Sequence, residues 1–205
     1  MTKPLTSVAA MILVEEGKLH LTDPVGRFLP GFDRLQVAQA TANPTLSRLT
    51  YATVPQARQM TVQDLLRHTS GLTYPETTAN QAVRQALIER GFLTVGGPEF
   101  DARAMAPDEF VQRLAQAPLM HQPGTTYEYS LSTDVLGRVV EKVSGQRLET
   151  FLEERLFRPL RMADTGFALK DGQAGRLAAH LGVDWARNDA PVAMIDVTRP
   201  PGNAS

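Results

Sequence analysis

The segment 2–16 constrains the fold more than any other part of the sequence, because it predicts a helix that is apolar on every side. Pro4 is compatible with the first turn of a helix, and Gly17 can adopt the left-handed conformation that ends one. Apolar residues occupy both faces, with Leu5, Val8, Ala9, Ile12 and Leu13 on one and Ala10, Met11 and Val14 on the other. Such a helix lies at the centre of a larger structure, so we expect other elements to cover it from several sides.

Most of the remaining sequence signals predict helices. Thr61 and Asp64 have the spacing of an N-terminal cap, for a short helix that ends near Ser70-Gly71. Further helices are predicted at 79–91, 108–117, 131–144 and 148–156. The segment 49–54 has a modest strand preference, 18–48 is interpreted as turns and polar surface, and the pattern weakens from Lys170 onward.

The composition excludes several classes of function. Lys and Arg number 21 and Asp and Glu number 22, for a net charge of -1 without long runs of either sign, so we expect no nucleic-acid partner. The absence of cysteine excludes disulfides, thiolate zinc sites and a cysteine nucleophile. The longest apolar run, 8–14, is well short of the roughly 20 residues that cross a bilayer, so no membrane segment is predicted.

Four short segments occur in an order and at spacings that are typical of one enzyme family. They are Met1-Thr2-Lys3-Pro4, His68-Thr69-Ser70-Gly71-Leu72, Pro123-Gly124-Thr125-Thr126-Tyr127-Glu128-Tyr129-Ser130 and Pro159-Leu160-Arg161-Met162, with Leu136-Gly137 and Val143-Ser144-Gly145 between the last two. The chain resembles the serine β-lactamase and penicillin-binding-protein superfamily, and specifically the class C β-lactamase-like branch that includes the family VIII carboxylesterases.

The resemblance implies an α/β fold of the β-lactamase/transpeptidase type. Residues 1–205 would be the central portion of a single catalytic domain, mostly helical and without most of the antiparallel sheet. Within it, 1–17 would be the buried active-site helix, 18–170 the mainly helical region, and 171–205 a connection towards the missing C-terminal sheet.

The family's nucleophile lies in a Ser-x-x-Lys motif, in which one helical turn places the lysine ammonium beside the serine hydroxyl. Lys3 matches the lysine, and the resemblance implies a catalytic role for it. The serine would stand immediately before Met1, and no serine of this chain is followed by a lysine three positions later. We therefore expect the sequence to be truncated at both ends, with the family's third motif beyond Ser205.

Tyr129 matches the family's catalytic tyrosine, which is proposed to take the serine proton and later to activate water. A phenol with an ordinary pKa near 10 is a poor base at neutral pH unless nearby cations lower that pKa. A lysine such as Lys3 is the expected cation, so the two residues are predicted to work as a pair.

The sequence departs from the class C β-lactamase pattern immediately after Tyr129. Those enzymes carry Tyr-x-Asn, whereas this chain has Tyr129-Ser130-Leu131, and Leu131 cannot form the hydrogen bonds of an amide. The resemblance therefore favours a serine hydrolase that cleaves carboxylic esters through an acyl-enzyme. The alternatives are a β-lactamase or D-alanyl-D-alanine carboxypeptidase, and a non-catalytic relative that binds such ligands.

Other candidate residues have simpler interpretations. A Ser-His pair of His68 and Ser70 is less expected than a structural helix stop, since two residues apart they point in different directions. The four histidines, His20, His68, His121 and His180, show no metal-ligand spacing, so no metal site is expected. The family resemblance implies no cofactor. Trp185 and Phe167 are expected to be ordinary packing residues, and the sequence leaves the compartment and oligomeric state open.

Overall fold

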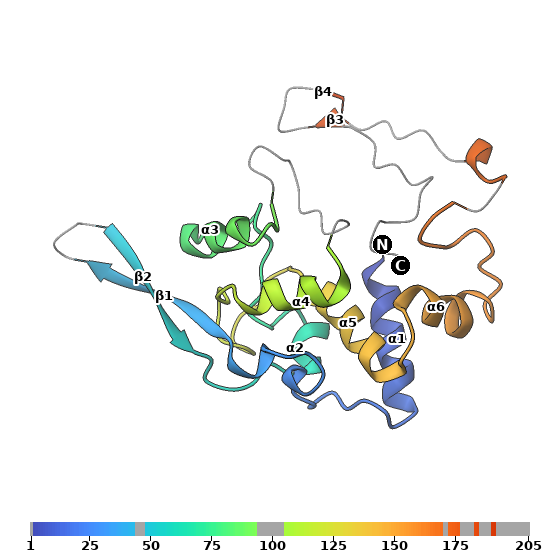
Figure 1. The fold of residues 1–205 in the computed structure, drawn as a ribbon, viewed down its shortest axis with the longest axis horizontal. Coiled ribbons are helices and arrows are strands. Elements are labelled where there is room, and N and C mark those ends of the chain that lie inside the picture. Colours follow the sequence, from blue (N-terminus) through green and yellow to red (C-terminus); the bar gives the residue numbers. More distant parts are fainter. Residues whose placement is uncertain are drawn as a thin grey trace.

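The computed structural model describes residues 2–43, 48–93, 105–169, 172–176, 183–184 and 190–191 (Figure 1). Helices dominate it, and their bounds are α1 Lys3–Glu15, α2 Val62–Leu66, α3 Gln81–Glu89, α4 Pro107–Ala115, α5 Ser132–Ser144 and α6 Leu148–Leu152. Shorter turns of helix are η1 Val25–Arg27, η2 Phe32–Arg34, η3 Glu153–Phe157 and η4 Ala174–Arg176. The strands form two antiparallel pairs, β1 Gln36–Asn43 with β2 Arg48–Pro55, and β3 Val183–Asp184 with β4 Ala190–Pro191.

Helix α5 is the centre of the helical body, because it contacts α1, α2, α4 and α6 (Figure 1). Gly137 allows the close approach, since a Cβ there would lie 3.0 Å from the Leu148 side chain and 3.8 Å from that of Thr6. The helix ends where it was expected to, at Gly145, which has the left-handed φ of 69°.

Helix α1 confirms the predicted element, and the described residues cover it on one part of its surface. Thr6, Ala9, Ala10 and Leu13 are buried, and α1 packs on α5 and α6. Val8 and Met11 lie on another face, where the side chains are 42% and 40% exposed. The described residues therefore cover only part of this apolar helix.

The β1–β2 hairpin corrects the interpretation of 18–48 as turns and polar surface alone. The strand predicted at 49–54 exists as β2, and β1 pairs with it from Gln36↔Pro55 to Asn43↔Arg48. Alanine and glutamine give β1 little strand propensity, so the pairing depends on backbone contacts. At its base, the Ala38 N–H donates to the Leu119 carbonyl at 2.8 Å, which ties the hairpin to the body.

Helix α2 has the predicted cap but is shorter than expected. The Thr61 side chain accepts from the Asp64 N–H, and the Asp64 carboxylate accepts from the Thr61 N–H in return. The helix ends at Leu66, ahead of the expected Ser70-Gly71, because His68 adopts a left-handed φ of 53°. The chain then turns again at Gly71, where φ is 85°.

The predictions for the other helices hold within a few residues at their ends. Asn80 caps α3, with its side-chain oxygen accepting from the N–H groups of Ala82 and Val83. The segment predicted as 148–156 is α6 followed by the wider turns of η3. Across the described residues, every helix falls short of the length and apolarity that crossing a bilayer requires.

Candidate active site

Lys3 and Tyr129, far apart in the sequence, lie together at the N-terminal end of α1. The Lys3 Nζ atom is 4.7 Å from the centroid of the Tyr129 ring, within the range of a cation–π contact. Lys3 is the first residue of α1, and Pro4 in the first turn removes an N–H that would have had no helical partner. Helix geometry and the 123–130 loop thus bring together the two residues that the sequence singled out.

Tyr74 is a third member of this group, and the sequence analysis missed it. Lys3 Nζ donates a hydrogen bond of 2.8 Å to the Tyr74 hydroxyl, and the Tyr74 and Tyr129 rings lie 5.8 Å apart between centroids. Tyr74 sits three residues beyond Gly71, on an irregular segment without periodicity. Its nearness to the His68–Leu72 motif was the only sequence signal, and a lone tyrosine there is not specific.

The electrostatics of the group favour a charged Lys3. Partial burial disfavours the charged ammonium, but the hydrogen bonds and negative potential of the surrounding groups outweigh burial and raise the pKa of Lys3. Among the groups that raise it, Tyr74 has the largest effect, followed by Tyr129 and Asp134. Burial raises the pKa of Tyr74, with Lys3 acting in the opposite direction. At neutral pH the pair is therefore an ammonium donating to a neutral phenol.

Asp134, in the first turn of α5, supplies a negative charge to this site. Its side chain is exposed to solvent. Desolvation by the surrounding protein nevertheless raises the pKa of the carboxyl, and the charges of Lys3 and Arg138 act in the opposite direction. Asp134 therefore acts as a solvent-accessible counter-charge to Lys3.

The backbone on both sides of Tyr129 is bonded to His68. The Glu128 N–H donates to the His68 carbonyl at 2.8 Å, and the Ser130 N–H donates to His68 Nδ1 at 3.2 Å. The His68 and Tyr129 rings are 5.0 Å apart between centroids, with a tilt of 30°. Tyr129 itself remains 53% exposed, so its side chain is accessible from solvent while its backbone is fixed.

Three buried serine hydroxyls connect the segment after His68 with the end of the Tyr129 loop and the start of α5. Ser132 Oγ lies 2.7 Å from Ser70 Oγ and 2.8 Å from Ser130 Oγ, and all three residues are fully buried. Ser70 Oγ also accepts from the Leu72 N–H at 3.1 Å. Ser70 therefore bonds to Ser132 at the start of α5 and not to His68, consistent with a structural role for this motif.

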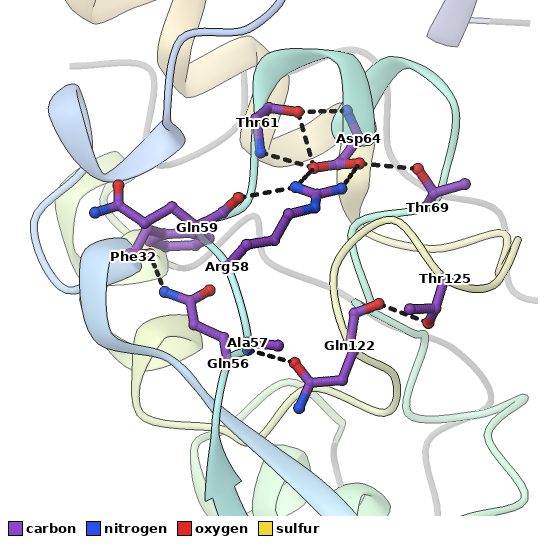
Figure 2. Close-up of polar contacts among 10 residues, drawn as sticks. All are labelled: Phe32, Gln56, Ala57, Arg58, Gln59, Thr61, Asp64, Thr69, Gln122 and Thr125. Atoms are coloured by element: carbon purple, nitrogen blue, oxygen red, sulfur yellow. Dashed lines mark hydrogen bonds and ion pairs between the residues drawn. The ribbon is translucent and has the colours of Figure 1, made fainter.

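A second polar cluster supports the turn that precedes Tyr129 (Figure 2). Arg58 donates to both carboxylate oxygens of Asp64, at 2.7 and 2.8 Å, and the Thr69 hydroxyl donates to the same carboxylate at 3.2 Å. The Thr69 carbonyl accepts from the Gly124 N–H at 2.7 Å, while Gln122 Oε1 accepts from the Ala57 N–H at 2.7 Å. Gly124 and Gln122 are thereby fixed against the α2 region.

The remaining sequence candidates lie elsewhere. Among the described residues, no group of three or more His, Asp or Glu side chains could hold a metal ion. Phe167 is 38% exposed, and Trp185 and His180 lie outside the described residues. An open cavity of about 500 Å³ beside the β1–β2 hairpin includes Tyr51 and Met120 but neither Lys3 nor Tyr129, so it does not belong to the lysine–tyrosine group.

Comparisons with known proteins identify the family of this chain. The Beta-lactamase family model matches residues 1–202. Protein Rv1367c of Mycobacterium tuberculosis is 38% identical over 189 residues, covering 90% of this chain and 42% of the relative. Esterase EstB of Burkholderia gladioli is 34% identical over 208 residues, covering all of this chain and 46% of the relative.

The fold comparison gives the same result. The structure of EstCE1, described as a hydrolase with promiscuous acyltransferase activity, matches with a TM-score of 0.59 and 30% identity, over 83% of this chain and 39% of that one. The chain thus spans less than half the length of the curated relatives named here. The family match over residues 1–202 shows that this chain belongs to the β-lactamase family.

Proposed function

We propose that this chain is part of the catalytic domain of a serine hydrolase that cleaves carboxylic esters through an acyl-enzyme. The observation that carries the proposal is the position of the Lys3 ammonium, 2.8 Å from the Tyr74 hydroxyl and 4.7 Å from the centroid of the Tyr129 ring. An ammonium beside two phenols can stabilise negative charge on oxygen while a proton moves. Residues 1–205 would be the central, mostly helical portion of that domain.

In the proposed reaction, the nucleophile is a serine directly before Met1, one helical turn from Lys3. Its Oγ attacks the ester carbonyl, its proton passes to the Tyr129 oxygen, and backbone N–H groups hold the oxyanion. The C–O bond to the alcohol breaks, and Tyr129 returns the proton to the departing oxygen. Water then attacks the acyl-enzyme with the same proton transfers, and no cofactor takes part.

Lys3 and Tyr129 are the proposed catalytic residues. Lys3 stabilises the developing charge on the serine and tyrosine oxygens, and the raised pKa of Lys3 fits this electrostatic role better than that of a proton acceptor at neutral pH. Tyr129 moves the proton, for which its exposed side chain leaves room. Tyr74 would position the Lys3 ammonium through the hydrogen bond it accepts.

Ester cleavage is proposed over lactam cleavage because of Leu131. This residue stands where class C β-lactamases carry the asparagine that contacts the substrate, and its side chain is fully buried. Neither its chemistry nor its position allows it to hydrogen-bond a ligand. The names of Esterase EstB and of the hydrolase EstCE1 support acyl transfer from esters.

The decisive experiment uses the full-length protein encoded by the gene. Sequencing upstream of the Met1 codon should show an open frame with a serine codon directly before it, and a fluorophosphonate probe should label that serine in tryptic peptides. Turnover of a short-chain p-nitrophenyl ester should far exceed that of nitrocefin. Lys3→Ala and Tyr129→Phe should each lower ester kcat by about 100-fold or more, on the scale of lost acid–base catalysis.

Other outcomes would identify the alternatives. Faster turnover of nitrocefin or of a D-alanyl-D-alanine peptide would assign a β-lactamase or carboxypeptidase. A stop codon upstream, or no labelling of folded full-length protein, would refute catalysis and favour a non-catalytic relative that binds such ligands.

A further inference from the structure

His68 directs its polar atoms at the loop that carries Tyr129. Its carbonyl accepts from the Glu128 N–H and its Nδ1 accepts from the Ser130 N–H, so its two bonds bracket Tyr129 on either side. Its Nε2 lies 3.5 Å from the Thr133 hydroxyl, at the start of α5. The ring also lies against Tyr129, with 5.0 Å between centroids.

These contacts require a neutral imidazole. Nδ1 can accept from the Ser130 N–H only while it carries no proton, which places the single ring proton on Nε2, facing the Thr133 hydroxyl. A second proton, on Nδ1, would point the Nδ1–H group at the Ser130 N–H, so neither group could accept a hydrogen bond from the other. The backbone bond that fixes Ser130, the residue after Tyr129, would then be lost.

The surroundings of the ring keep it neutral. Lys3 of α1 faces it as a cation, and the Tyr127 and Tyr129 phenols of the loop face it as rings. Burial, followed by the charge of Lys3, lowers the pKa of His68. Protonation is therefore confined to acidic solution, below the ordinary titration range of histidine near pH 6.5.

We infer that His68 is a positioning residue for Tyr129, whose neutral ring fixes the 128–130 backbone and whose protonation releases it. Its consequence for turnover rests on the proposed function, whereas the contact with the loop does not. This role goes beyond the helix stop that the sequence suggested, because the side chain and the backbone both act on the tyrosine loop.

Two substitutions separate the acceptor from the ring. His68→Asn suits the left-handed φ of 53° and keeps a side-chain oxygen for the Ser130 N–H, but does not titrate. His68→Phe keeps an aromatic ring against Tyr129 and removes the acceptor. His20→Asn, at an exposed histidine outside this cluster, is the matched control.

In full-length protein, we expect His68→Phe to lower ester kcat about 3- to 10-fold, the loss of one hydrogen bond, with KM changed less than 2-fold. His68→Asn should restore part of that loss at pH 8 and should lack the fall in kcat that wild type shows as His68 protonates. Wild-type kcat in His68→Phe, or an unchanged acid limb in His68→Asn, would overturn the catalytic part of the inference.

An activity-independent measurement tests the positioning itself. With ¹³C-histidine and ¹⁵N-serine labels in full-length protein, the Ser130 amide shift should follow the His68 ring titration with the same midpoint, and should be flat in His68→Asn. His20→Asn should leave it unchanged. A Ser130 amide that ignores the His68 titration would refute the inference even in an active enzyme, and coupled titrations in an inactive protein would refute only the proposed function.

Discussion

Gly124→Ala is expected to break the ion pair between Arg58 and Asp64, although Gly124 is not part of that pair. Gly124 has a φ of +85°, and a Cβ there would lie 1.9 Å from Nη2 of Arg58. An alanine therefore fits only if the guanidinium moves. Arg58 cannot move without losing its bonds of 2.7 and 2.8 Å to Asp64, whose side chain is only 7% exposed.

The expected loss of stability has two parts. An alanine in left-handed conformation costs about 1–2 kcal/mol. Breaking a buried ion pair costs about 3–5 kcal/mol, which we reduce to about 2 kcal/mol because the Arg58 side chain is 47% exposed and Asp64 keeps its bonds to Thr61 and Thr69. Gly124→Ala should thus cost about 3–4 kcal/mol. Gly145→Ala, with a φ of +69° and nothing within 4 Å of its Cβ, should cost about 1–2 kcal/mol.

A double-mutant cycle isolates the mechanism. Arg58→Ala alone should cost about 2 kcal/mol. It also removes the obstacle to a Cβ at Gly124, so the double variant should be no less stable than Gly124→Ala, a coupling of about -2 kcal/mol. Urea unfolding of the full-length variants, followed by far-UV circular dichroism, measures each value. Additive costs, or equal costs for Gly124→Ala and Gly145→Ala, would refute the reasoning.

Three further predictions concern the same region. Tyr74→Phe removes the hydrogen-bond acceptor of Lys3 and should lower ester kcat about 5- to 30-fold with little change in KM. The control Tyr127→Phe, at a residue 66% exposed, should leave kcat unchanged, and equal steady-state kinetics for the two variants would exclude a role for Tyr74. Gly71→Ala would place a Cβ 2.1 Å from the His121 carbonyl oxygen and should cost about 2–5 kcal/mol in urea unfolding, well beyond any loss from φ alone. Burial opposes the charge of Asp64, but hydrogen bonds from Arg58 and Thr61 outweigh burial and lower the folded-state pKa of Asp64 below the unfolded value near 4. The stability that this shift provides is complete above about pH 4 and is lost as the pH falls through the lowered pKa. This contribution should be absent in Asp64→Asn when unfolding is measured from pH 2 to 6.

Local patterns in the sequence account for the short-range structure and point to the main residues of the site. Interactions within one or two helical turns determine three of these features: the Thr61–Asp64 cap, the end of α5 at Gly145 and the extent of α1. Their sequence patterns can therefore be recognised without knowledge of the tertiary structure. Lys3 and Tyr129 were found because they stand in short motifs that resemble a known family.

The contacts between groups that are distant in the sequence arise from the packing of the folded chain. Strand β1 forms because its backbone pairs with β2 and with Leu119, which its alanines and glutamines do not indicate. Tyr74 joins Lys3, and His68 holds the Tyr129 loop, through contacts between residues that are 62 to 71 positions apart. A hydrogen bond depends on distance and direction in space, and no local pattern in the chain encodes those for partners brought together by helix packing.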